Sequence, residues 1–186
     1  MKRVLIGLMA AAVATIGFGG VGTFASENGE LQTFGTGTVT IGTDGTSATI
    51  VNTIVNGVAQ FGGVYIQSKS QSGMLLKDVT FSFVSTGAVT GGAPRFSIPI
   101  NTDGGGGSVA GYAFIDAAGC GGVSGGTTTV NTSSSSCHVN FLSVDYPNWA
   151  ALAVAFPTAR VAQGHFPFII ADGSVGSYTV TSIVLT

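Results

Sequence analysis

The chain has 186 residues, of which 8% are charged, and it holds 30 glycines and a formal net charge of −2. Six Lys and Arg residues provide no basic surface for phosphates, which argues against a nucleic-acid partner and against binding to anionic lipid. The polarity comes from Ser, Thr, Gly and Asn, which favour strands and turns over helix interiors. The composition is therefore typical of an all-β extracellular protein.

The first 25 residues have the pattern of a secretory signal peptide. Lys2 and Arg3 precede a long uncharged stretch, and small residues then lead to Ala25. The same stretch is long enough to cross a bilayer as an uncleaved anchor, but its Gly-rich second half favours cleavage. We expect a signal peptide over residues 1–25 and a single secreted domain over residues 26–186, with no membrane span in the mature chain.

The mature chain alternates apolar and polar residues in short stretches between Gly-rich turns, which predicts about nine strands and a β-sandwich. Residues 27–31 have no such pattern and are expected to be a loose terminus. A long hairpin is expected from residues 47–55 and 58–68, because Asn56-Gly57 between them suits a type I′ turn, in which both central residues need positive φ.

The strand expected over residues 95–100 is bracketed by Pro94 and Pro99, which predicts that it lies at a sheet edge, because proline cannot donate to a strand ladder. The other strands are expected over residues 36–41, 74–85, 109–116, 127–131, 137–144, 166–171 and 178–185.

Cys120 and Cys137 are the two cysteines of the chain. Exported proteins meet oxidising conditions, so we predict that these cysteines form a disulfide across a loop rich in Gly, Ser and Thr. Two unpaired thiols are the alternative. A zinc site is not expected, because it needs four ligands and only His138 lies nearby in the sequence.

One stretch, near residues 149–156, has a helical period. Trp149, Leu152 and Phe156 recur at helical spacing after Asn148, a residue that caps helix starts well. Because the single tryptophan shares this apolar face, we expect it in the core rather than at a binding surface.

The C-terminal half resembles the end of secreted bacterial jelly-roll domains. The resemblance covers roughly residues 75–186 and rests on Trp149-Ala-Ala-Leu, Pro157, Asp172-Gly and the terminal Tyr178-Thr-Val-Thr-Ser-Ile-Val. It implies a jelly-roll sandwich, and some proteins of that architecture are carbohydrate-binding modules. Such domains often carry acidic residues in the last strand, where this chain has Thr181 and Ser182.

Strand alternation also predicts a face that can bind a ligand. Tyr65 lies between Val64 and Ile66, so burial of those two sends Tyr65 to the solvent side, where its loss would barely affect stability. Aromatic, amide and guanidinium groups on one sheet face suit a neutral polyol, although a solvated sheet face is the simpler interpretation. The candidate ligand-binding residues are Tyr65, Gln67, Arg95, His138 and Asn140.

No catalytic residue, cofactor or metal site is predicted. His138 and His165 are the two histidines, and no serine lies in a nucleophile-elbow motif. Asp44, Asp103 and Asp172 each precede a glycine, which first of all marks a turn; one of these loops is the place for a structural calcium, if the protein binds one.

The expected function is therefore non-catalytic: binding of an extracellular glycan, a similar neutral ligand or another cell-surface component. Two alternatives remain open. The Gly, Ser and Thr richness also suits a structural or surface-associated matrix protein, and the few acids and histidines leave a secreted hydrolase as the third hypothesis.

The leader prediction has a direct test. The exported protein should begin at or near Ser26, because signal peptidase cleaves after the small residues that end the leader. Intact-mass measurement and N-terminal sequencing of exported material check this. Recovery of the protein in the membrane fraction with Lys2 still present would contradict it.

Overall fold

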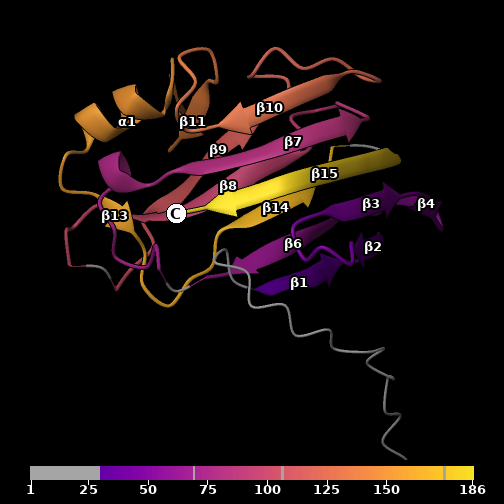
Figure 1. Ribbon diagram of the computed structural model, residues 1–186, viewed down its shortest axis with the longest axis horizontal. Coiled ribbons are helices and arrows are strands. Elements are labelled where there is room, and N and C mark those ends of the chain that lie inside the picture. The colour runs from indigo at the N-terminus through magenta and orange to yellow at the C-terminus, as the bar shows by residue number, and fades with distance from the viewer. Residues whose placement is uncertain (1–29, 69, 106, 174) are drawn as a thin grey trace, which may run out of the picture.

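The structure, a computed structural model, describes residues 30–68, 70–105, 107–173 and 175–186. These residues form two antiparallel sheets that face each other, with one short helix at one end (Figure 1). The predicted fold class, an all-β antiparallel sandwich with one helix, is confirmed. The predicted signal peptide lies outside the described residues.

The described residues form a larger sheet of eight strands and a smaller sheet of five. The larger sheet has the order β1 (Glu30–Gly35), β6 (Gly62–Gln67), β14 (Phe168–Ala171), β8 (Arg95–Asn101), β9 (Gly111–Asp116), β11 (Val139–Phe141), β12 (Val144–Tyr146), with β13 (Arg160–Val161) also paired to β8. The smaller sheet has the order β10 (Thr127–Asn131), β7 (Phe81–Gly87), β15 (Gly176–Leu185), β3 (Ala48–Asn52), β2 (Thr38–Ile41). The remaining elements are the hairpin β4 (Ile54–Val55) and β5 (Val58–Ala59), the 3-10 turn η1 (Leu76–Asp78) and the helix α1 (Trp149–Ala155).

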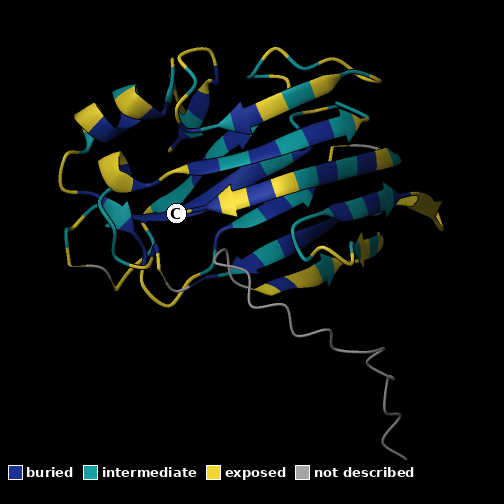
Figure 2. Cartoon of the chain, viewed as in Figure 1, coloured by how far each residue is buried: buried dark blue, intermediate teal, exposed yellow. Residues whose placement is uncertain are grey.

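The core lies between the two sheets because alternate residues of each strand point inward (Figure 2). On β7, Phe81 and Phe83 are fully buried, whereas Ser82 between them is half-buried. Phe81 of the smaller sheet stacks on Phe96 of the larger sheet with their ring planes 7° apart. Burial of a large apolar side chain is worth about 1.5–3 kcal/mol, so this pair contributes directly to holding the sheets together.

The helix forms as predicted and closes one end of the sandwich. Asn148 caps it, since its Oδ1 accepts the backbone N–H of Ala151 at 2.9 Å. Trp149 is buried, and its indole Nε1 donates to the carbonyl oxygen of Leu76 at 2.7 Å. Trp149 is therefore a core residue that joins α1 to η1, as the helical pattern predicts.

The Asn56-Gly57 turn is confirmed, but the long hairpin around it is wrong. Asn56 and Gly57 both have positive φ, at 53° and 78°. The hairpin arms, β4 and β5, are only two residues long, and the strands that flank them, β3 and β6, belong to opposite sheets. The side-chain Nδ2 of Asn52 donates to the carbonyl oxygen of Ala171 at 2.7 Å and joins the two sheets where the chain crosses.

Two further predictions are wrong for physical reasons. Glu30 and Leu31 are not loose but begin β1, whose pattern is hard to recognise because Phe34 lies on its outer side. The strand with Pro99 is not an edge, since β8 lies between β14 and β9. Along the side of β8 that faces β14, the pairing with β14 ends at Ser97 and the pairing with β13 begins at Ile100. Pro99 therefore lies in the gap between two short partner strands, where no N–H is needed from it.

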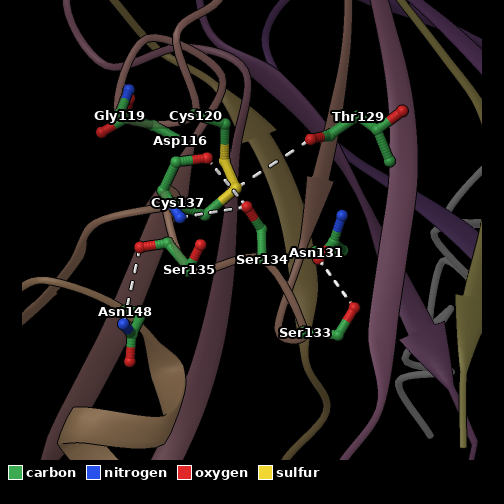
Figure 3. The surroundings of a disulfide bond; sticks show 11 residues. Asp116, Gly119, Cys120, Thr129, Asn131, Ser133, Ser134, Ser135, Cys137 and Asn148 are labelled. Atoms are coloured by element: carbon green, nitrogen blue, oxygen red, sulfur yellow. Dashed lines mark hydrogen bonds between the residues drawn. A yellow bond between two sulfur atoms is a disulfide. The ribbon is translucent and has the colours of Figure 1, made fainter.

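The predicted disulfide joins Cys120 to Cys137 (Figure 3). It links the loop after β9 to the start of β11 and encloses β10. The Nδ2 of Asn148 also donates to the carbonyl oxygen of Ser135 at 3.5 Å, so the residue that caps α1 contacts the bridged loop. The disulfide and this contact attach a polar loop to the sandwich.

Removing the disulfide should destabilise the fold. The cysteines are 17 residues apart, and closing a loop of that length is worth about 3 kcal/mol in the chain-entropy model. We expect Cys137→Ser to lower the free energy of unfolding by about 2–4 kcal/mol in urea titrations. Reduced wild-type protein is the matched control and should unfold at the same urea concentration as the variant. An unfolding free energy equal to that of the oxidised wild type would contradict the prediction.

Candidate functional site

The predicted site residues lie on the larger sheet or at its border. Tyr65 and Gln67 come from β6, Arg95 from β8 and Asn140 from β11, while His138 directly precedes β11 and is exposed. Strand pairing places Tyr65 and Asn140 in one row across the outer face of the sheet. That row reads Gln32, Tyr65, Phe168, Ser97, Phe114 and Asn140.

The outer face carries a cluster of half-buried rings, here named the aromatic face: Phe34, Tyr65, Tyr112, Phe114 and Phe168. The ring centroids of Phe34 and Tyr65 are 4.4 Å apart, and that of Phe168 is 5.6 Å from each of them. Tyr112 extends the cluster, with its centroid 5.5 Å from that of Phe168. Tyr65 does point away from the core as predicted, but it packs among other rings and is not simply solvated.

A glycine allows the rings to pack close to the sheet. Gly63 pairs with Phe34 on one side and with Ile170 on the other. A Cβ atom at Gly63 would lie 2.5 Å from Cζ of Phe34, so only glycine leaves room for that ring. The aromatic face therefore depends on the backbone of β6 as well as on its side chains.

Polar groups surround the rings and contact one another. The Nε2 of Gln67 donates to Oε1 of Gln32 across the β1–β6 pair. The guanidinium of Arg95 lies 5.0 Å from the centroid of the Phe114 ring and donates to Oδ2 of Asp172 at 2.5 Å. This ion pair neutralises the cation beside the rings, so the site favours an uncharged ligand over an acidic one.

Further polar groups lie along the same row. Asn140 donates from Nδ2 to Oδ1 of Asp145 at 2.8 Å, on the neighbouring strand β12. Ser97 is fully buried in the row between Phe168 and Phe114, and its Oγ has no hydrogen-bond partner among the described residues. The Nε of Arg95 is likewise buried without a partner within the described chain. These atoms retain hydrogen-bonding capacity beneath the rings.

Sequence reasoning identified the polar rim but missed most of the rings. Phe34 was hidden because the start of β1 shows no clear alternation. Phe168 and Ile170 lie on the outer face of a strand whose residues are all apolar, and such a strand indicates that its outer face is apolar too. Tyr112 and Phe114 alternate with buried Ala113, which is the signal that identifies them.

The Asp-Gly motifs form turns, and each carboxylate has a partner in the protein. The Oδ1 of Asp44 accepts from the backbone N–H of Thr46 and from the hydroxyl of Ser47, and these hydrogen bonds hold the pKa of the Asp44 carboxyl below its ordinary value. Asp103 accepts from the backbone N–H of Gly105 at 2.7 Å, and Asp172 pairs with Arg95. A structural calcium at one of these loops stays an untested hypothesis.

The histidines and acids do not gather into a catalytic or metal-binding cluster in the described part of the chain. His138 and His165 are both exposed. Within the described ranges, no group of three or more His, Cys, Asp or Glu side chains is placed to hold a metal ion. In the same part of the chain, no helix is both long and apolar enough to cross a membrane. Comparisons with protein-family models, curated proteins and solved structures find no match to this chain.

Packing within the aromatic face should be measurable by a double-mutant cycle. Because the Phe34 and Tyr65 rings are in contact, we expect Phe34→Ala and Tyr65→Ala to show a coupling of about 0.5–1.5 kcal/mol in the free energy of unfolding. Phe34→Ala with Phe114→Ala is the matched control, since three strands separate β1 from β9 and the two changes should be additive. Additive effects of Phe34→Ala and Tyr65→Ala would show that the rings do not support each other.

Proposed function

We propose that this protein is a secreted, non-catalytic binding module that holds an extracellular neutral glycan on the aromatic face. The observation that carries the proposal is the half-exposed ring cluster of Phe34, Tyr65, Phe168 and Tyr112 on the outer side of a sheet. Rings at that position add little to the main core, which lies on the other side of the sheet. Ligand sites are typically lined by aromatic groups with a few placed polar ones, and this face has both.

The chemistry around the rings indicates the ligand class. The C–H faces of a sugar ring pack on aromatic faces, while its hydroxyls need donors and acceptors at the side. Gln67 and Asn140 offer amides at either end of the face, and the guanidinium of Arg95 lies beside the Phe114 ring. Because that ion pair leaves no unbalanced cation beside the rings, a neutral glycan fits better than an acidic one.

The strand order supports the jelly-roll form of the sandwich. Four strands of the smaller sheet follow the path β3-β15-β7-β10, and four of the larger sheet follow β6-β14-β8-β9. Along the chain, β3, β6, β7 and β8 alternate between the sheets, and β9, β10, β14 and β15 do so as well. Two interlocked Greek keys produce this order, and we infer a jelly roll from it.

Export is the remaining part of the proposal. The disulfide between Cys120 and Cys137 supports it, because such bonds form and persist outside the reducing cytosol. The N-terminal pattern of a signal peptide is consistent with the same compartment.

A glycan array probed with the exported protein tests the proposed function, followed by calorimetry with the best neutral oligosaccharide. Tyr65→Ala should weaken binding by about 1–3 kcal/mol, the loss expected when a contact anchor is removed. Tyr65→Phe keeps the ring and should retain most of the affinity. Thr40→Ala, an exposed residue on β2 of the other sheet, is the control and should bind like wild type.

Since Tyr65 packs against other rings, each variant must first be shown to be folded by its cooperative thermal transition. An array without neutral-glycan binders would contradict the proposal. So would a folded Tyr65→Ala variant that binds as tightly as wild type.

A further inference from the structure

One end of the sandwich presents aliphatic side chains to solvent on the tips of its loops. The hairpin β4–β5 projects from this end, opposite α1, and is exposed along its length (Figures 1 and 2). Ile54 is 61% exposed and Val58 is 68% exposed. Val55 in the same hairpin and Val123 in the loop after β9 are exposed as well.

Three other connections lie at the same end and contact one another. The loop after β9 meets the loop after β7 through a hydrogen bond from the backbone N–H of Gly125 to the carbonyl oxygen of Gly87, at 2.7 Å. The loop after β7 meets the turn after β14, where a Cβ atom on Gly91 would lie 3.2 Å from Cα of Gly173. The hairpin adjoins that turn because Asn52, at the end of β3, pairs with Gly176.

This end of the molecule has almost no charge. Residues 53–61, 88–94 and 117–126 include no Asp, Glu, Lys or Arg. The turn after β14 contributes Asp172, which is neutralised by Arg95. Asp116, at the base of the loop after β9, accepts the backbone N–H of Gly119 at 2.6 Å, so the two acids lie at the bases of the loops and the projecting parts are apolar or neutral. From this combination we propose that the β4–β5 end inserts into the interface of an uncharged lipid bilayer.

The backbone of the hairpin limits how deeply it can enter a bilayer. Entry into hydrocarbon is costly for unpaired N–H and C=O groups, and β4 and β5 pair Ile54 with Ala59 and Val55 with Val58. At the base, the backbone N–H of Gln60 donates to the carbonyl oxygen of Thr53 at 2.9 Å. Within the described residues the hairpin pairs with no third strand, so the outward N–H and C=O groups of its two edges need water, and insertion stops in the hydrated interface.

A pair of polar side chains at the base of the hairpin, Thr53 and Gln60, sets the depth of insertion. The hydroxyl of Thr53 donates to Oε1 of Gln60 at 2.7 Å, and Nε2 of Gln60 donates to the carbonyl oxygen of Thr36 at 2.6 Å. From Thr53 to the turn at Asn56 is three residues, or about 10 Å of strand. Amphipathic segments in a bilayer interface bury their apolar face to about 5–10 Å. The polar pair would therefore lie at the headgroups while Ile54, Val55 and Val58 enter the acyl boundary.

The shape of this end favours lipid over a protein partner. Its apolar side chains are on separate tips, with glycines and hydroxyls between them, rather than on one flat patch. A fluid bilayer covers separate tips without a matching surface, whereas a protein partner needs shape complementarity over a continuous area. The missing basic residues argue against recognition of acidic headgroups.

Flotation of the exported protein with neutral phosphatidylcholine vesicles tests the proposal. Wild type should float with the vesicles to the same extent at low and high salt, because the interaction is not electrostatic. The double variant Ile54→Ser with Val58→Ser should lower the partition coefficient at least about tenfold, since two aliphatic side chains no longer leave water. Val154→Ser is the matched control, because Val154 is 79% exposed but lies on α1 at the opposite end.

Three outcomes would overturn the proposal: wild type that stays with the protein-only fraction, a folded double variant that floats like wild type, or a Val154→Ser variant that loses as much binding as the double variant. Sedimentation velocity without lipid tests whether this end mediates self-association instead. A wild-type dimer that the double variant converts to monomer would assign this end to self-association instead. The glycan experiment is independent, since the hairpin variants leave the aromatic face unchanged.

Discussion

The packing of one sheet on the other is the constraint on which the rest of this structure depends. Phe81 of β7 stacks on Phe96 of β8, and this contact joins two strands that follow each other in the chain but belong to opposite sheets. Once these residues face inward, strand alternation decides the side of every neighbour. Arg95 and Ser97 must then lie on the outer side of β8, and cross-strand pairing places Phe168 and Phe114 beside Ser97.

The same constraint separates the two kinds of aromatic residue in this protein. Trp149 packs beneath η1, and the carbonyl oxygen of Leu76 in η1 accepts its indole N–H. Its contribution is therefore structural. The rings of the aromatic face pack sideways against each other instead and stay half-exposed. Gly63 permits this arrangement by leaving the space that a Cβ atom would fill. A sheet face that is only half covered in this way has apolar area available for a ligand.

Sequence patterns predicted the features of this fold that depend on neighbours in the chain. The Asn56-Gly57 turn, the strand at Thr127–Asn131 and the helix after Asn148 all follow from local geometry or periodicity. Sheet membership was not predictable in this way. The pairing of β8 with β14 depends on residues about 70 positions apart, so the edge position inferred from Pro99 had no local evidence against it.

The candidate site was predictable to the same degree and for the same reason. Alternation identified the outer side of β6 from Val64 and Ile66 alone, and Tyr65 does lie there. The neighbours of Tyr65 come from β1 and β14, which are far from it in sequence, so its ring contacts appear only when the strands are paired. An isolated tyrosine on a strand and a tyrosine packed against two other rings give the same sequence signal. The two differ in their contribution to stability and in the apolar area that they present.

The two proposed surfaces also place limits on each other. The strands of both sheets run toward the β4–β5 end, so insertion of that end into a bilayer would stand the strands steeply on the membrane (Figure 1). The aromatic face lies along the side of the strands, and Tyr65 and Phe168 are on β6 and β14, whose β4–β5 ends are Gly62 and Ala171. Tyr65 lies three positions along β6 from Gly62, which is about 10 Å of strand. The rings of Tyr65 and Phe168 would therefore lie above the headgroups, where a glycan at the membrane surface can reach them while the hairpin remains inserted.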